Sequence, residues 1–253
     1  MKGVILSHNP HVRIVDLTHA IDPQDILQGA FILNAAVDYF PANTVHLSVV
    51  DPGVGSERSA VVVRRAPHFF VAPDNGILSL ILSKGIDTAV RIENTEFFNH
   101  PVSATFHGRD IFAPVAGYLS KRNKLEKIGS TICADELVQI SPRFPEKRFA
   151  DRIEGCVVAI DSFGNLMTNI STQTLNDFSA THSNKKLGIR IGPTLIPTIS
   201  KTYSSVGKQD SVAVIGSRNY LEVSINMGNA AQQFGVHKGD RVIVTPIESK
   251  KTL

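Results

Sequence analysis

The sequence contains no tryptophan, only two cysteines and few aromatic residues, which make up 7% of its 253 residues. Two cysteines, Cys133 and Cys156, are too few for a disulfide framework. Neither of them lies at zinc-finger spacing from a second cysteine or a histidine. We therefore expect two buried or semi-buried thiols and a protein that works in a reducing compartment.

Long apolar runs and concentrated charge are missing as well. No stretch reaches the ~20 apolar residues that a membrane span needs, and the apolar run at residues 3–6 is too short for a signal peptide. The net charge is only +3, and its densest basic group is "SKRNKLEK" from Ser120. A nucleic-acid binder usually concentrates basic residues and interleaves aromatics. The composition predicts a soluble cytoplasmic protein with no nucleic-acid or membrane partner.

The common nucleotide, metal and hydrolase motifs are also absent. The sequence has no G-x-x-x-x-G-K-[ST], no G-x-G-x-x-G after a strand, no H-E-x-x-H and no G-x-S-x-G. We therefore expect no resident metal and no bound cofactor. An apolar share of 42% is nevertheless ample for a folded core.

The hydrophobic pattern that is present divides the chain into two parts. Strands are expected at 12–19, 44–51, 60–65 and 68–73, and helices from Asp22–Pro23 to Pro41, over 77–85 and over 110–121. This rhythm predicts an α/β domain with a central mixed or parallel sheet over residues 1–142. Residues 143–154 break the pattern and read as a linker. Short strands separated by Gly, Asn and Asp predict a smaller, mostly β, barrel-like domain over 155–253.

The segment "DPGVGSER" carries two charged residues between apolar runs. Asp51 ends the run 45–50, and Arg58 precedes the next run. The residues of "DPGVG" are typical of an ordinary turn. However, Asp51 lies at the carboxyl end of an expected strand, which is where ligands bind in open α/β sheets. A tight hairpin would bring the two side chains together. They form either an ion pair that stabilises the hairpin or a charge pair placed in a cleft.

Two more segments of the first part carry polar residues beside an expected helix. "PDNG", residues 73–76, is a turn signal at the end of a strand. "FHGRDIFAP" places His107, Arg109 and Asp110 before a helix. Asp110 is suited to cap that helix, and Arg109 to pair with a carboxylate. His107 is either a packed core residue or a catalytic one.

The second part has fewer chemical signals. "IDSFGNLMTNI", residues 160–170, indicates a hairpin with an Asn-rich turn. Its alternative interpretation is a purine site, in which an amide reads base edges and Phe163 stacks. Glu222, inside the expected strand "YLEVSIN", faces either water or a ligand hydroxyl. The residues by themselves thus indicate a two-domain α/β-plus-β protein with an Asp–Arg–His cleft.

Several segments, taken in order, resemble the S-adenosyl-L-methionine (SAM) hydroxide adenosyltransferase family, also called SAM hydrolases, which is related to SAM-dependent fluorinase and chlorinase. They are "MKGVIL", "FPANTVHLSVVDPGVGSER", "PDNG", "FHGRDIFAP", "DSFGNLMTNI" and "LEVSINMGNAA". The resemblance spans nearly the whole chain. Each motif alone is modest, whereas their common order is specific.

The resemblance implies an enzyme that cleaves SAM to adenosine and L-methionine by attack of water on C5′. It implies that Asp51, Arg58 and His107 are the catalytic set and that Asp51 also contacts the substrate. It further implies a homotrimer with active sites between the N-terminal domain of one subunit and the C-terminal domain of the next. The implied substrate-binding residues of the C-terminal domain are Phe163 against the adenine, Asn165, Ser217, Glu222 and the backbone of Ile225.

Other interpretations stay open at this point. Family members carry, before the segment that matches "MKGVIL", a further strand and an aspartate in a "TDFG"-like turn that holds the ribose. We expect a form of the protein that starts at Met1 to bind ribose weakly, and one alternative is a non-catalytic adenosine or SAM binder. A SAM-dependent halogenase is the second alternative. The Asp–Arg–His set argues against it, because a halide pocket has no use for a base.

Overall fold

The chain divides into two compact units, Met1–Ile140 and Ser141–Leu253. Their structure comes from a computed structural model, which describes residues 1–122, 124–141, 146–183 and 185–247. Each unit has hydrophobic clusters of its own. No helix in these ranges is long and apolar enough to cross a membrane.

The first unit contains short helices and a five-stranded sheet. Its helices are α1 (Lys2–His8), α2 (Ile26–Ala36), η1 (Val37–Tyr39), α3 (Ser79–Leu82), η2 (Thr95–Phe97), η3 (Gly108–Phe112), α4 (Ala113–Arg122) and η4 (Ala134–Glu136). Its strands are β1 (Val45–Leu47), β2 (Ala60–Arg65), β3 (His68–Pro73), β4 (Thr88–Arg91) and β5 (Thr131–Ile132).

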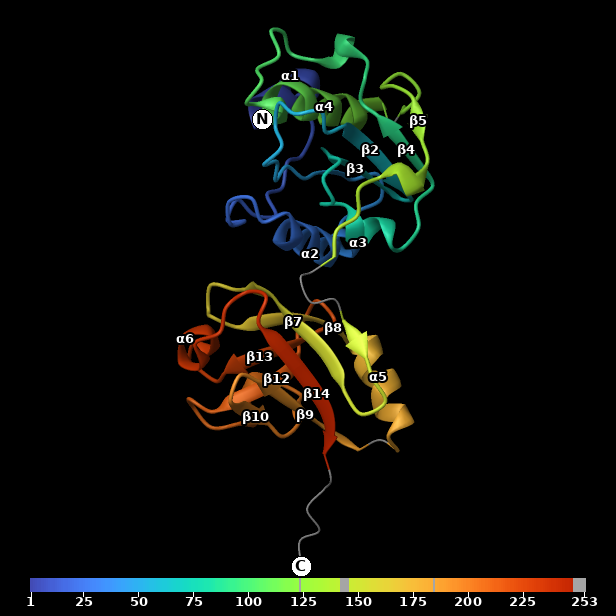
Figure 1. The fold of residues 1–253 in the computed structure, drawn as a ribbon. Coiled ribbons are helices and arrows are strands. Elements are labelled where there is room, and N and C mark those ends of the chain that lie inside the picture. Colours follow the sequence, from blue (N-terminus) through green and yellow to red (C-terminus); the bar gives the residue numbers. More distant parts are fainter. Residues whose placement is uncertain (123, 142–145, 184, 248–253) are drawn as a thin grey trace, which may run out of the picture. The chain divides into compact units, whose positions relative to one another are not determined.

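The sheet of the first unit is mixed and covered on both faces. Its strand order is β1-β3-β2-β4-β5, in which β1 is parallel to β3 and the other pairs are antiparallel. Successive residues of β2 point to opposite faces, so Val62 packs beneath α4 while Val61 and Val63 pack towards α2 and α3. Figure 1 shows α1 and α4 on one side of the strands and α2 and α3 on the other.

Two expectations for the start of the chain are wrong. Residues 12–19 form no strand, although apolar and polar residues alternate there. A strand is stable only beside another strand, and this segment pairs with none. The helix predicted from Asp22 and Pro23 begins at Ile26 instead. Its N-cap is Asp25, whose carboxylate accepts from the backbone N–H of Gln28 at 2.8 Å and so satisfies a free donor of the first turn.

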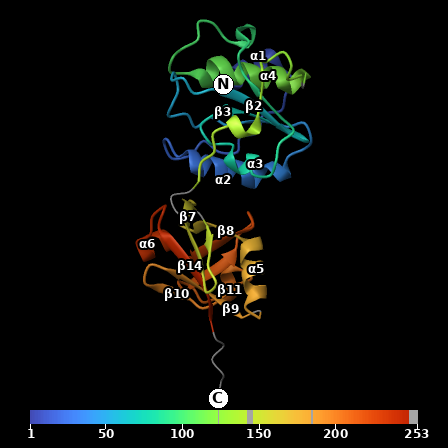
Figure 2. The same ribbon diagram turned by 45° about the vertical axis from the view of Figure 1, so that its right-hand side comes forward.

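The second unit is mostly β. Its elements are β6 (Lys147–Arg148), β7 (Ile153–Ile160), β8 (Leu166–Ser171), α5 (Thr172–Thr181), β9 (Lys186–Ile191), β10 (Thr194–Ile196), β11 (Ile199–Ser200), η5 (Tyr203–Ser205), β12 (Ser211–Ile215), β13 (Tyr220–Ile225), α6 (Ala230–Phe234) and β14 (Arg241–Ile247). The strand order is β10-β9-β14-β7-β8-β13-β12-β11, with β6 beside β7. The two ends of the sheet approach each other, since β11 contacts β9 and β10 contacts β12, so the sheet is nearly closed (Figure 2).

The predicted linker, 143–154, differs from the structure in part. Residues 143–145 lie outside the described residues, but Lys147 and Arg148 pair with Glu154 and Ile153 as a short antiparallel ribbon. Backbone hydrogen bonds hold such an edge strand whatever the polarity of its side chains. The pattern of apolar and polar residues therefore did not predict β6. The helices α5 and α6 were not predicted either. The Ser171 hydroxyl, which accepts from the Thr174 amide at 3.1 Å, is the cap that marks the start of α5.

Candidate active site

A twelve-residue loop after β1 carries the first two charged residues of the candidate site. The expected tight hairpin is wrong, because β3 lies between β1 and β2 in the sheet. The chain from 48 to 59 instead passes from the end of β1 to the start of β2 on the far side of β3. Asp51 and Arg58 are nevertheless paired, as their spacing predicted.

The "PDNG" turn at the end of β3 holds both stems of this loop. The Asn75 amide donates to the Val50 carbonyl at 2.8 Å, next to Asp51, and the Asp74 backbone N–H donates to the Ser59 carbonyl at 2.9 Å, next to Arg58. Gly76 has φ +96°, and a Cβ there would lie 2.5 Å from Ile140. Sequence reasoning treated this segment as a turn at the end of a strand and did not show that it holds the loop that carries Asp51 and Arg58.

Asp51, Arg58 and His107 form one hydrogen-bonded set. Arg58 binds Asp51 with two donors, Nε to Oδ1 at 2.9 Å and Nη2 to Oδ2 at 2.5 Å. The same Nη2 lies 2.9 Å from Nδ1 of His107. The Arg58 and Asp51 side chains are only 11% and 6% exposed, so the pair is largely withdrawn from water. Phe112 lies under the guanidinium, 5.2 Å from ring centroid to Cζ, and was missed by sequence reasoning.

The contact with Arg58 fixes the protonation state of His107. A guanidinium has donors only, so Nδ1 of the ring must accept, and a neutral ring then carries its proton on Nε2. Burial and the positive charge of Arg58 lower the pKa of His107, against the opposing effects of Asp51 and Asp110. The ring is therefore neutral at pH 7, with an Nε2–H that can donate a hydrogen bond.

Asp110 does not cap the helix, contrary to the prediction, because it lies inside the single π-turn η3 that precedes α4. Its carboxylate is 2% exposed and accepts from Arg109 at 2.6 and 2.8 Å and from the Ser103 backbone N–H at 2.9 Å. The Arg109 guanidinium lowers the pKa of Asp110 to about 2. The Arg109–Asp110 pair thus fastens the 103–110 segment in which His107 stands. Such π-turns are frequent at functional sites.

The substrate-binding residues expected in the second unit lie around one turn and one strand. Asp161 organises the turn between β7 and β8 by accepting from the backbone N–H groups of Phe163 and Asn165, both at 2.9 Å, and from the Asn165 amide at 2.9 Å. The Phe163 ring is left 75% exposed. Gly164 has φ +84°, and a Cβ there would lie 2.1 Å from the Asn229 side chain.

Glu222 lies on β13, and Asn165 lies directly before the neighbouring strand, β8. Leu166 is paired with Val223, so Asn165 lies beside Ser224, two residues along β13 from Glu222. One oxygen of Glu222 accepts from the Tyr203 hydroxyl at 2.5 Å and from the Ser224 hydroxyl at 3.2 Å. Burial and this carboxylate raise the pKa of Tyr203.

The other two expected contacts lie at opposite ends of β13. Ser217 is exposed in the turn that precedes the strand. Ile225, at the end of the strand, is buried, and its carbonyl accepts from the Gly228 N–H at 3.1 Å. The charged set therefore belongs to the first unit and the expected adenosine contacts to the second.

Comparison with known proteins identifies the family. The SAM hydroxide adenosyltransferase N-terminal domain matches residues 1–129, and the C-terminal domain of the same family matches residues 155–243. The chain belongs to the SAM hydroxide adenosyltransferase family. The resemblance seen in the motifs is thereby confirmed over both units.

Individual relatives agree with the family assignment. An (R)-S-adenosyl-L-methionine hydrolase of Salinispora tropica is 34% identical over 96% of this chain and 90% of its own length. A fluorinase of Nocardia brasiliensis is 28% identical over 96% of this chain and 90% of its own. The crystal structure of an uncharacterized conserved protein from Thermotoga maritima has a TM-score of 0.87 and 33% identity, covering 96% of this chain and 93% of that one.

Proposed function

We propose that the chain hydrolyses SAM to adenosine and L-methionine, with water or hydroxide attacking C5′. Family membership over both units and the similarity to a SAM hydrolase support this reaction. The observation that carries the mechanism is the partly buried Asp51–Arg58–His107 set, in which one guanidinium nitrogen contacts both partners.

The chemistry asks for an activated nucleophile rather than for an acid. The sulfonium leaves as a neutral thioether: the C5′–S bond breaks with its electron pair going to sulfur, a C5′–O bond forms, and the proton that the attacking water loses passes to solvent. Water is a poor nucleophile because its pKa is about 15.7. A fixed positive charge favours the hydroxide form of a nearby water, and a dry site strengthens that effect.

Each residue of the set has a role that its contacts support. Asp51 holds the guanidinium through two hydrogen bonds and stays placed to touch the substrate. Arg58 supplies the positive charge that favours hydroxide. His107 presents Nε2–H, which can hold the hydroxide oxygen by donating to it. It can take up a proton at Nδ1 only by giving up the bond from Arg58.

The second unit would supply the adenosine site. In this proposal the exposed Phe163 ring lies against the adenine, the amide of Asn165 and the hydroxyl of Ser217 contact the nucleoside, and Glu222 accepts from a hydroxyl. The backbone of Ile225 contributes as well. Because these residues and the charged set belong to different units, we further propose a homotrimer in which they meet between neighbouring subunits.

The reaction is tested by its products. The protein is incubated with SAM, with and without chloride, and adenosine, methionine and 5′-chloroadenosine are separated by liquid chromatography. Hydrolysis predicts adenosine and methionine in equal amounts in both samples. A halogenase, which the similarity to a fluorinase keeps as the second candidate, would form 5′-chloroadenosine when chloride is present. A folded protein that binds adenosine and forms no product would overturn both.

A further inference from the structure

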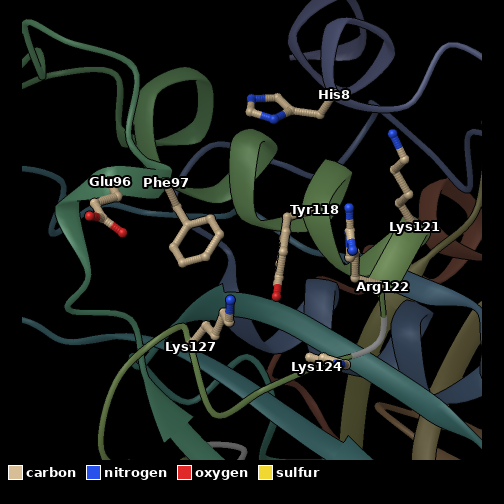
Figure 3. A pocket seen from close by; sticks show the side chains of 8 residues that line it. All are labelled: His8, Glu96, Phe97, Tyr118, Lys121, Arg122, Lys124 and Lys127. Carbon is tan, nitrogen blue, oxygen red and sulfur yellow. The ribbon is translucent and has the colours of Figure 1, made fainter.

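A cavity lies in the first unit, at the opposite end of α4 from the charged set. Its volume is about 490 Å³, and it is lined by His8, Glu96, Phe97, Tyr118, Lys121, Arg122, Lys124 and Lys127. Figure 3 shows the Tyr118 phenol extending from α4 into the space between Phe97, Arg122, Lys124 and Lys127. Phe112, beneath Arg58, precedes the first residue of α4, whereas Arg122 is its last. Ten helical residues span about 15 Å, so the two places are distinct.

Four cationic side chains surround this opening. No ion pair involves Lys121, Arg122, Lys124 or Lys127 within the described parts of the chain. The one carboxylate in the lining, Glu96, accepts from the Asn94 amide at 3.4 Å. Cations in the last turn of a helix are ordinarily explained by the helix dipole. That explanation covers Lys121 and Arg122 but not Lys124 and Lys127, which follow the helix.

The walls of the cavity are held in place by packing. A Cβ on Gly117 would lie 2.8 Å from Cβ of His8, so the glycine lets α1 approach α4 closely. The Phe97 and Tyr118 rings are in contact, with centroids 4.5 Å apart. Two hydrogen bonds join neighbouring segments: Asn9 Nδ2 donates to the Ser120 hydroxyl at 3.0 Å, and Asn94 Nδ2 to the Lys127 carbonyl at 3.0 Å.

The loop after α4 presents two of the lysines on one side. Leu125 and Ile128 are buried and anchor the loop. Lys124 and Lys127 are exposed and line the cavity, whereas the intervening Glu126 does not line it. The loop therefore presents its cations to the opening and keeps its carboxylate out.

We propose that this cavity binds a multiply charged phosphate anion, either a free polyphosphate or the phosphate chain of a nucleotide. Like charges gathered at one opening repel one another, and an anion that contacts several of them removes that repulsion. A phosphate chain offers many acceptor oxygens to the donors of lysine, arginine and the Tyr118 hydroxyl. The inference is independent of the proposed SAM hydrolysis.

The test is isothermal titration calorimetry of the full chain with sodium tripolyphosphate at low salt. The variant Lys124→Glu/Lys127→Glu reverses two charges of the cavity. The matched control, Lys185→Glu/Lys186→Glu, makes the same change of net charge at two exposed lysines of the second unit. We expect micromolar binding by the wild type and by the control, and a loss of at least tenfold in affinity for the cavity variant. A second titration uses ATP, with excess adenosine present to occupy any adenosine site. ATP that binds more tightly than tripolyphosphate would indicate that the cavity takes a nucleotide rather than a free polyphosphate.

Either of two results would overturn the proposal. One is that the wild type binds neither probe at low salt. The other is that the control loses as much affinity as the cavity variant, which would mean that net charge alone attracts the anion. The melting temperature of each variant without ligand shows that the comparison is made on folded protein.

Discussion

At the scale of the residue, the most informative contact is the one between Arg58 and His107. It assigns the acceptor nitrogen of the ring and leaves Nε2–H as the free donor. We predict that His107→Ala lowers kcat for SAM hydrolysis by about 10²-fold or more, because the donor to the hydroxide is lost, with the Kd for adenosine near the wild-type value. His100→Ala, which changes an exposed histidine that precedes the 103–110 segment, is the control. Unchanged turnover by folded His107→Ala would remove the histidine from the mechanism.

The same contact predicts how turnover depends on pH. Burial and Arg58 lower the pKa of His107 below its usual 6.5, so the neutral ring persists as the pH falls through 6.5. Protonation of Nδ1 at lower pH removes the acceptor for Arg58 and places two positive charges together. We therefore expect the fall in kcat that His107 causes to lie below pH 6.5 and to be missing from the profile of His107→Ala. A fall above pH 6.5 that the wild type shows and His107→Ala lacks would contradict this assignment.

At the scale of the element, β1 and β3 join through a buried histidine pair. Nε2 of His46 lies 3.4 Å from Nδ1 of His68, and the His46 ring stacks on Phe70 at 5.1 Å. Burial, and secondarily His68, lower the pKa of His46 to about 4. The folded state thus favours the neutral ring. The stability that His46 contributes to the fold is fully present above pH 6.5 and declines as the pH falls from 6.5 towards 4.

This pair gives a prediction about stability. Between pH 7 and 5 the wild type should lose about 2 kcal/mol of unfolding free energy through His46. His46→Leu should lack that part of the decline, whereas the exposed His11→Leu should retain it. Urea unfolding at both pH values measures the difference, and carboxylate contributions cancel because all three proteins share them. Equal declines in His46→Leu and the wild type would show that His46 does not titrate in this way.

The turn between β7 and β8 is the element on which the proposed adenine contact depends. Gly164 has φ +84° and touches Asn229, whereas Gly192 has φ +52° and nothing within 4 Å of its added Cβ. Gly192→Ala should cost about 1 kcal/mol through backbone strain alone. Gly164→Ala adds a clash, so we expect a larger loss of stability in urea and a weaker affinity for adenosine. Equal effects of the two substitutions would show that the approach to Asn229 is unimportant.

The sequence predicts an element well when the pattern of that segment alone indicates its structure, and poorly when the structure depends on which distant segment lies beside it. The apolar runs that became β2, β3, β7, β12 and β14 were recognised, because buried strands are apolar whatever their partners. The order of strands was not: the insertion of β3 between β1 and β2 overturned the hairpin. Asp51 and Arg58 lie seven residues apart, so their pairing could be expected. His107 lies 49 residues from Arg58, and the residues alone indicated no more than a cleft shared with them, whereas the family resemblance made the three one catalytic set.

At the scale of the whole molecule, the proposed site needs residues from both units. If they meet between subunits of a ring-shaped trimer, His107→Ala and Glu222→Ala should each be inactive alone yet complement each other when combined. The two variants are coexpressed with different tags, and the mixed trimers are purified through both tags. Each mixed ring then has one of its three sites formed by an intact first unit and an intact second unit, so turnover should recover to about a third of the wild-type value. Light scattering checks that the purified species is a trimer. Mixed trimers that stay inactive, or a monomer that still hydrolyses SAM, would place the whole site within one chain.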